Sequence, residues 1–102
     1  MPRRRNPYRL ADVERRAAKY GSFEIPPRKN REDLWPGDLA KLIFEDIGER
    51  LWVRVTDCSR WPCFEGVIIS SPLDSGVHRG DKIYFSPENV ADILNPDESA
   101  MN

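Results

Sequence analysis

The sequence lacks the features that mark several protein classes. No apolar run approaches the roughly 18–20 residues that a membrane-spanning helix needs. Two cysteines are too few for a disulfide scaffold, so we expect a reducing, cytoplasmic location. The basic N-terminus is followed by no apolar stretch, so we expect no secretory signal. No phosphate-binding loop, nucleophile elbow or second cysteine pair is present, and we therefore expect no enzyme, catalytic residue, cofactor or metal.

The residues that are present describe a small folded domain. The chain has 102 residues, of which 39% are hydrophobic and 10% aromatic, enough for one modest core. The aromatic content and the balance of 16 basic against 17 acidic side chains exclude a collagen-like, coiled-coil or wholly disordered chain. We expect a single domain over residues 7–94, a flexible basic arm over residues 1–6 and a disordered tail over residues 95–102.

The two parts of the chain carry opposite charge. Residues 1–31 hold ten basic and three acidic side chains, a formal charge of +7, and residues 32–102 hold six and fourteen, a formal charge of −8. This division indicates either a basic segment that binds nucleic acid or an acidic partner, or one that folds back onto its own acidic domain, which we favour. The candidate nucleic-acid-binding residues are Arg3, Arg4, Arg5, Arg9 and Arg16.

The first regular element predicted is a helix over residues 7–20. Asn6 is a suitable N-cap. Pro7 suits the first helical position, because an N–H at that position would have no partner within the helix and proline therefore loses no hydrogen bond. Apolar residues spaced three or four apart form one stripe, which consists of Leu10, Val13, Ala17 and Tyr20. A short helix this rich in charge is marginal alone, so we expect it to dock on the rest of the domain.

Strand patterns dominate the remainder of the chain. After an irregular stretch over residues 22–37, we expect strands over residues 39–44, 51–58, 64–70, 82–85 and 91–94. Ser86 and Pro87 begin a single helical turn over residues 86–89. The segment 64–70 is apolar on both faces, which is typical of a central strand covered on its second side. We expect the helix to provide that cover, with Trp52 beneath it.

The predicted fold class is α+β, with the N-terminal helix packed on a small, mostly antiparallel five-stranded sheet that resembles an SH3-like barrel. Four motifs add a second resemblance: an acidic residue before a Trp-Val strand (49–55), Phe-x-Gly before a hydrophobic strand ending in Pro (64–72), Gly-Asp-x-hydrophobic (80–83) and hydrophobic-x-Asp-Ile (90–93). Together they resemble the DUF2314 family of small uncharacterised bacterial proteins. The resemblance covers residues 49–94 and implies no known activity and no site residues.

Two cysteines flank a short loop, as Cys58 and Cys63. A hairpin around this loop is expected to place them nearly opposite one another, within reach of a disulfide. We favour two free thiols, ahead of a disulfide formed under oxidation. A zinc site is the weakest interpretation, because His78 is the only other soft ligand in the chain.

Aromatic and basic residues at turns are the candidate binding residues. Trp35 and Trp61 each precede a proline, and a turn tryptophan either clamps the edge of the core or is exposed for binding. We expect Trp35 in the core and leave Trp61 open between the two. Trp61, with Arg60 beside it, is the first choice for a functional residue. His78 and Arg79 are further candidates, although a solvated loop is the simpler interpretation of both.

These observations favour a small non-enzymatic binding or interaction protein over other functions. Its partner is an unknown protein or small molecule, and self-association through the helix or a sheet edge is a further hypothesis. The alternative is weak nucleic-acid binding through the basic arm and helix, which the acidic remainder of the chain opposes. An enzyme is the third hypothesis, because no motif pairs the many acidic residues with a base or a cofactor loop.

Overall fold

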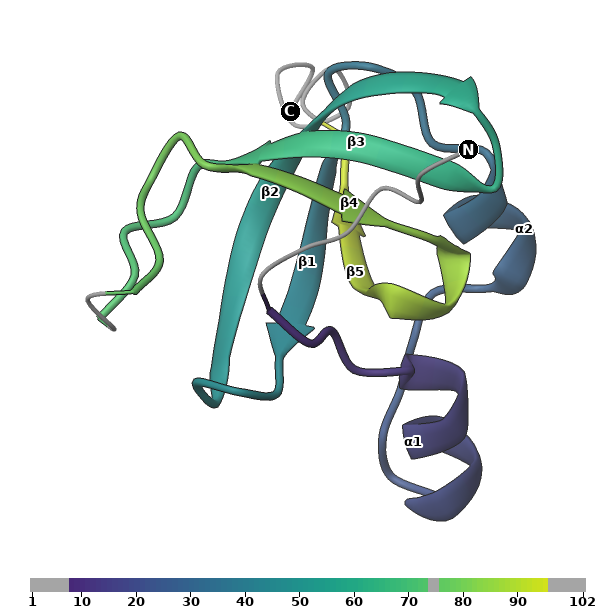
Figure 1. The fold of residues 1–102 in the computed structure, drawn as a ribbon. Helices are drawn as coiled ribbons and strands as arrows, with labels where there is room; N and C mark the ends of the chain where they lie inside the picture. Colours follow the sequence, from purple (N-terminus) through teal and green to yellow (C-terminus); the bar gives the residue numbers. More distant parts are fainter. Residues whose placement is uncertain (1–7, 74–75, 96–102) are drawn as a thin grey trace, which may run out of the picture.

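The computed structural model describes residues 8–73 and 76–95 (Figure 1). In chain order the elements are α1 (Val13–Lys19), α2 (Arg28–Glu32), β1 (Leu39–Phe44), β2 (Glu49–Arg60), β3 (Cys63–Ile68), β4 (Lys82–Phe85), the 3-10 turn η1 (Pro87–Asn89) and β5 (Val90–Leu94). Within these ranges, no helix combines the length and the apolar composition that crossing a membrane requires. Residues 1–7 and 96–102, which include the expected arm and nearly all of the expected tail, lie outside the described part.

The five strands form one antiparallel sheet in the order β4-β3-β2-β1-β5. The α+β class and the five-stranded antiparallel sheet are therefore confirmed. β1 lies between β2, where Lys41 is opposite Trp52, and β5, where Ala40 is opposite Ile93. Among the described residues β4 and β5 are edge strands that share no pairing, so the sheet is not closed and a barrel is not confirmed.

Local sequence signals placed several elements correctly. β1 and β4 have the expected bounds, and η1 is the expected turn with Ser86 as its N-cap. The Ser86 N–H donates to the Asn89 side-chain oxygen at 2.9 Å, which closes this turn. The helix α2 was not expected, because its five residues carry no apolar stripe.

The main core lies on one face of the curved sheet. Alternate residues of β1 and β2 point into it, and residues of β3, β4 and β5 complete it. Its largest members, all nearly inaccessible to solvent, are Phe44, Phe64, Leu42, Ile68 and Ile83. Phe64 and Phe85 pack with their ring centroids 5.5 Å apart, which joins β3 to β4 through side chains as well as through the backbone.

The expected helix over residues 7–20 is wrong over residues 8–12, and residue 7 lies outside the described part. α1 begins at Val13, and its N-cap is Asp12, whose carboxylate accepts the Arg15 N–H at 3.0 Å. The preceding residues are extended and pair with β1 beyond the end of β5, since the Ala11 N–H donates to the Ile43 carbonyl at 2.9 Å. Those unpaired backbone groups of β1 compete with helix formation and prevail. The expected cap Asn6 lies outside the described residues.

The expected position of the helix over β3 and Trp52 is also wrong. A helix of seven residues is about 10 Å long and buries a single side chain, Val13. Val13 packs in a small second cluster against Ile43 of β1 and Ala91 of β5, away from β3. The Lys41 ammonium lies 5.0 Å from the centroid of the Trp52 ring, so a neighbouring strand residue, rather than α1, covers this tryptophan.

Candidate functional site: an acidic groove along the edge strand β5

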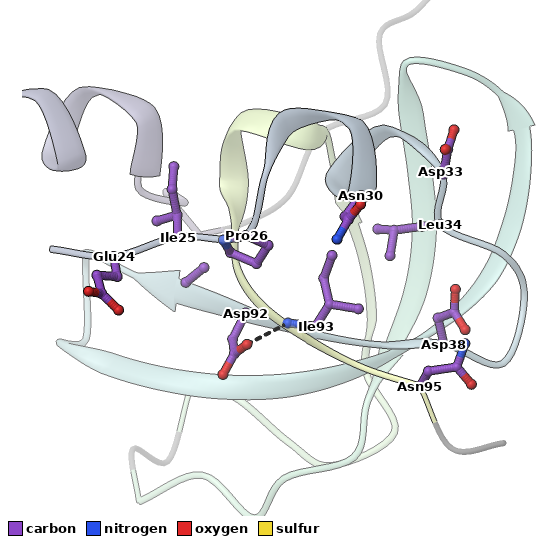
Figure 2. A pocket seen from close by; sticks show the side chains of 11 residues that line it. Glu24, Ile25, Pro26, Asn30, Asp33, Leu34, Asp38, Asp92, Ile93 and Asn95 are labelled. Atoms are coloured by element: carbon purple, nitrogen blue, oxygen red, sulfur yellow. Dashed lines mark hydrogen bonds between the residues drawn. The ribbon is translucent and has the colours of Figure 1, made fainter. Parts of the chain in front are cut away.

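A groove runs along the outer side of β5, opposite the segment that connects α1 to β1 (Figure 2). Its volume of about 670 Å³ lies within the range of ligand sites in proteins. We call it the β5 groove and define it by its lining residues: Glu24, Ile25, Pro26, Asn30, Asp33, Leu34, Asp38, Ala91, Asp92, Ile93 and Asn95.

The side chains of the β5 groove are apolar, acidic or, at Asn30 and Asn95, neutral amides. Ile25, Leu34 and Ile93 contribute apolar surface, and no lysine, arginine or histidine is among the lining residues. The carboxylates are those of Glu24, Asp33, Asp38 and Asp92. A concave surface lined by charge of one sign concentrates its field and attracts ligands of the opposite charge. The β5 groove therefore favours a cation.

Two of these carboxylates have structural tasks and two do not. Asp38 accepts the Trp35 N–H at 2.9 Å and so closes the turn before β1, and Asp92 accepts the Ile93 N–H at 2.8 Å. The side chains of Glu24 and Asp33 make no hydrogen bond or ion pair with the described residues. These two remain available to a ligand.

The four carboxylates do not converge on one point. Across residues 8–73 and 76–95, no group of three or more histidine, cysteine, aspartate or glutamate side chains has the arrangement of a metal site. Figure 2 shows Glu24 and Asp92 toward one end of the groove and Asp38 and Asn95 toward the other. Charge spread in this way matches an elongated cation better than a single ion.

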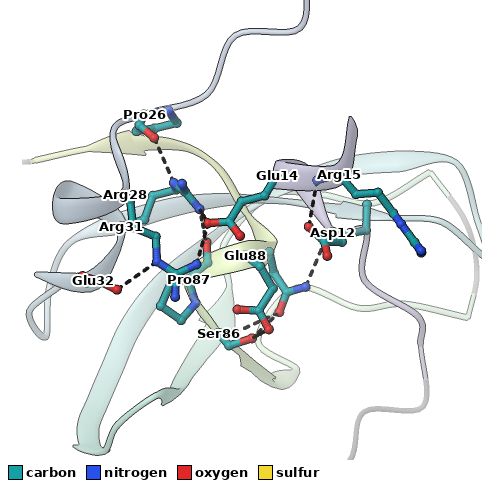
Figure 3. Close-up of polar contacts among 12 residues, drawn as sticks. Asp12, Glu14, Arg15, Pro26, Arg28, Arg31, Glu32, Ser86, Pro87 and Glu88 are labelled. Carbon is teal, nitrogen blue, oxygen red and sulfur yellow. Dashed lines mark hydrogen bonds and ion pairs between the residues drawn. The ribbon is translucent and has the colours of Figure 1, made fainter. Parts of the chain in front are cut away.

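The outer wall of the groove is fixed by the buried Arg31, which α2 supplies (Figure 3). Its side chain is only 4% exposed, and its guanidinium donates to the Pro26 carbonyl at 2.8 Å and to the Pro87 carbonyl at 2.9 Å. A third hydrogen bond, of 2.9 Å, goes to Glu14 of α1. One side chain thus ties the wall residue Pro26 to α1 and to η1.

Glu14 joins this arginine to a second one. Its carboxylate also accepts from Arg28, which in turn pairs with Glu32 at 2.8 Å. The hydrogen bond from Arg28 holds the pKa of Glu14 below its ordinary value, against the opposing effect of partial burial and together with Arg31. The hydrogen bond to Glu32, and after it the one to Glu14, raises the pKa of Arg28. The α1–α2 junction is therefore a charge network that positions the wall.

The tryptophans chosen from sequence are both exposed but lie outside the groove lining. Trp61 is 57% exposed at the turn between β2 and β3. Trp35 is 73% exposed, so its expected place in the core is wrong. The turn that carries Trp35 is fastened by its backbone, with the Gly37 N–H donating to the Val55 carbonyl at 2.8 Å, and the preceding Leu34 fills the core instead.

The other candidate binding residues also lie elsewhere. Arg60 is exposed beside Trp61. His78 and Arg79 are exposed in the loop before β4, where the His78 N–H donates to the Asp81 carboxylate at 2.9 Å and the ring nitrogen lies 3.6 Å from it. None of these three residues lines the β5 groove.

The candidate nucleic-acid-binding residues are only partly described. Arg3, Arg4 and Arg5 lie outside the described residues. Arg16 pairs with Glu45 at 3.5 Å, and the backbone N–H of Arg9 donates to the Asp46 carboxylate at 2.9 Å. Two acidic residues that follow β1, Glu45 and Asp46, thus bind the described part of the basic segment.

The expected geometry of the cysteines is wrong. Arg60, not Cys58, is opposite Cys63, because the register between β2 and β3 shifts after Asp57. Both cysteines are free, and the Cys58 thiol donates to the Leu34 carbonyl at 3.1 Å. Burial, with Asp57 and Asp38 nearby, raises the pKa of Cys58, which therefore stays protonated at neutral pH.

Sequence reasoning missed the β5 groove itself. The available signal was the surplus of acidic residues after position 31, together with an aspartate inside a short final strand, Asp92. A charged residue at such a position is typical of an edge strand. The sequence alone did not show that residues 24–38 lie across from that edge.

Comparison with known proteins adds no relative from which a function can be transferred. No protein-family model matches the chain, and neither a curated protein nor a solved structure gives a significant match. The resemblance to the DUF2314 family thus stays a prediction. Any function has to be argued from the residues and their geometry.

Proposed function

We propose that this protein is a small non-enzymatic binding protein whose ligand is a cationic peptide segment held in the β5 groove. The observation that carries the proposal is the groove itself: about 670 Å³ beside an edge strand, lined by four carboxylates and by no basic side chain. Ile25, Leu34 and Ile93 supply apolar contacts between the charges. A mixed lining of this kind suits a peptide better than a hydrated ion.

The same proposal includes an SH3-like arrangement of the sheet and a cytoplasmic location. The strand order β4-β3-β2-β1-β5, with one 3-10 turn between β4 and β5, supports the SH3-like arrangement. The two free thiols agree with a reducing compartment.

The acidic groove argues against the alternative of nucleic-acid binding at this site. Phosphates would be repelled by Glu24, Asp33 and Asp92, whereas a polycation would be attracted. We therefore expect the β5 groove to bind a polycation and to repel a polyanion.

The test is a fluorescence anisotropy titration with a labelled octapeptide in which lysine and valine alternate. A glutamate-valine octapeptide and a single-stranded oligonucleotide of similar length are the anionic controls. We expect only the lysine peptide to bind at about 0.15 M salt, and more tightly at lower salt. Binding of the oligonucleotide alone would contradict the proposal and favour the alternative.

A pair of matched variants locates the binding. Glu24→Gln/Asp33→Asn removes two groove charges that have no partner among the described residues, so the fold should be unaffected. At about 0.5 kcal/mol for each exposed ion pair, affinity should fall about fivefold. Glu45→Gln/Asp46→Asn removes the same charge after β1, keeps amide oxygens that can still accept from Arg16 and Arg9, and should change affinity little. Equal losses in both variants would show nonspecific attraction instead of a site.

A further inference from the structure

We infer that the ligand binds by adding a strand to β5: an extended basic segment of a partner protein pairs with the outer edge of β5. This inference rests on the proposed function and specifies how the peptide is held. Three observations carry it: the unpaired edge, the orientation of the Ile93 backbone, and the spacing of charged and apolar groups along the groove.

The outer edge of β5 is available for pairing. Among the described residues β1 is the only strand that pairs with β5, and the β5 groove occupies the other side. A strand edge presents a row of N–H and C=O groups that an extended peptide can use. Five residues of β5 span about 17 Å, which is long enough for a peptide of four or five residues.

The Ile93 backbone shows which way this edge points. Its N–H donates at 2.8 Å to the carboxylate of Asp92, a residue that lines the β5 groove (Figure 2). In an antiparallel strand the N–H and C=O of one residue point to the same edge. Ile93 therefore offers both a donor and an acceptor to an incoming strand.

Asp92 then has two states. Without a ligand, its carboxylate satisfies the Ile93 N–H and places a charge on the edge, which discourages unspecific pairing between strands. When a peptide carbonyl takes its place on that N–H, the carboxylate is released to pair with a basic side chain of the same peptide. The exchange favours a partner that brings both an extended backbone and a cation.

The groove also selects the partner's sequence. Side chains of an extended peptide alternate between two faces. The lining combines apolar residues, including Ile25, Leu34 and Ile93, with the carboxylates of Glu24 and Asp33, which have no partner within residues 8–73 and 76–95. A segment in which basic and apolar residues alternate satisfies both kinds of lining at once. We expect a lysine- or arginine-rich segment without proline at the pairing positions.

The experiment uses the full chain and the lysine-valine octapeptide in two N-methylated forms. One form carries methyl groups on the amides of the odd residues and the other on the even residues, which leaves charge and side chains unchanged. Only one set of amides faces β5 in an added strand. We expect one form to lose about tenfold or more in affinity and the other to bind nearly as well as the parent.

A spectroscopic readout follows the edge itself. In a ¹⁵N-¹H correlation spectrum, peptide binding should shift the amide of Ile93 and slow its hydrogen exchange, because the amide exchanges the exposed Asp92 carboxylate for a carbonyl within an added strand. The amide of Lys82, on the opposite edge strand β4, is the internal control and should stay in place.

The outcomes separate this inference from the proposed function. If both methylated forms bind like the parent and Glu24→Gln/Asp33→Asn still weakens them, the groove binds cations but adds no strand, and the inference is wrong. If no peptide shows dependence on the groove carboxylates, the proposed function itself is wrong. An effect of one methylation set, together with an Ile93 shift, supports both.

Discussion

Arg31 offers the sharpest test of how the groove wall is held. It is the one charged side chain that is buried in the described part of the chain, and it bonds to Pro26, Pro87 and Glu14. The substitution Arg31→Met keeps most of the unbranched stem and removes the guanidinium. The apolar packing of the stem is retained, so the loss of stability reports mainly on these hydrogen bonds.

The expected loss of stability follows from the two carbonyl groups that Arg31→Met leaves without a donor. The Pro87 carbonyl is acceptor of a buried hydrogen bond, and the Pro26 carbonyl of a partly buried one, so both lose a charged donor. An unsatisfied buried acceptor costs about 1–3 kcal/mol. Glu14 is 38% exposed and keeps Arg28, so it is not left as a buried unpaired charge. Part of this loss of stability is offset, because the variant no longer has to bury a charged guanidinium. We expect the free energy of unfolding to fall by about 2–4 kcal/mol.

Urea unfolding followed by far-UV circular dichroism measures this loss. The free energy of unfolding of a small domain falls by about 1–3 kcal/mol for each molar of urea, so the urea concentration at the midpoint should fall by roughly 1–3 M. Arg31→Lys keeps the charge without the planar fork and should lie between wild type and Arg31→Met. Arg28→Met removes an arginine of the same network that is 47% exposed and should have a smaller effect. Wild-type stability in Arg31→Met, or an equal loss in Arg28→Met, would refute this account of the wall.

Two further predictions concern α1. Val13→Asp places a carboxylate in the buried second cluster and should lower the free energy of unfolding by more than about 3 kcal/mol. Ala18→Asp, on the exposed face of α1, should have little effect in the same urea titrations. Because Arg28 holds the pKa of Glu14 below its ordinary value of 4.5, the ionised carboxylate stabilises the fold above that pH, and this stabilisation is lost as the pH falls through the lower folded value. Glu14→Gln should therefore flatten the decline of the melting temperature below pH 4.5, and identical slopes in both proteins would contradict the role of Glu14.

The sequence by itself determined the elements that short-range chemistry specifies. Short strand-like runs bounded by turn residues placed β1 and β4 at their observed bounds. Ser86 with Pro87 placed η1, because a cap and a fixed φ act within one turn. The expected five antiparallel strands also follow from patterns that repeat every second residue. Each of these signals is complete within fewer than ten residues.

Only the tertiary structure decided where α1 begins, where Trp35 points and where the groove lies. Residues 8–12 had helical spacing, yet the free edge of β1 offered their backbone a partner more than thirty positions away, at Ile43. The wall of the β5 groove depends on Arg31 reaching Pro87 across 56 positions. Edge strands, buried guanidinium bonds and the spacing of Glu24 and Asp92 across a groove arise from contacts between distant segments. Helix and strand propensities and hydrophobic periodicity are properties of single segments, so they carry no information about contacts between distant segments.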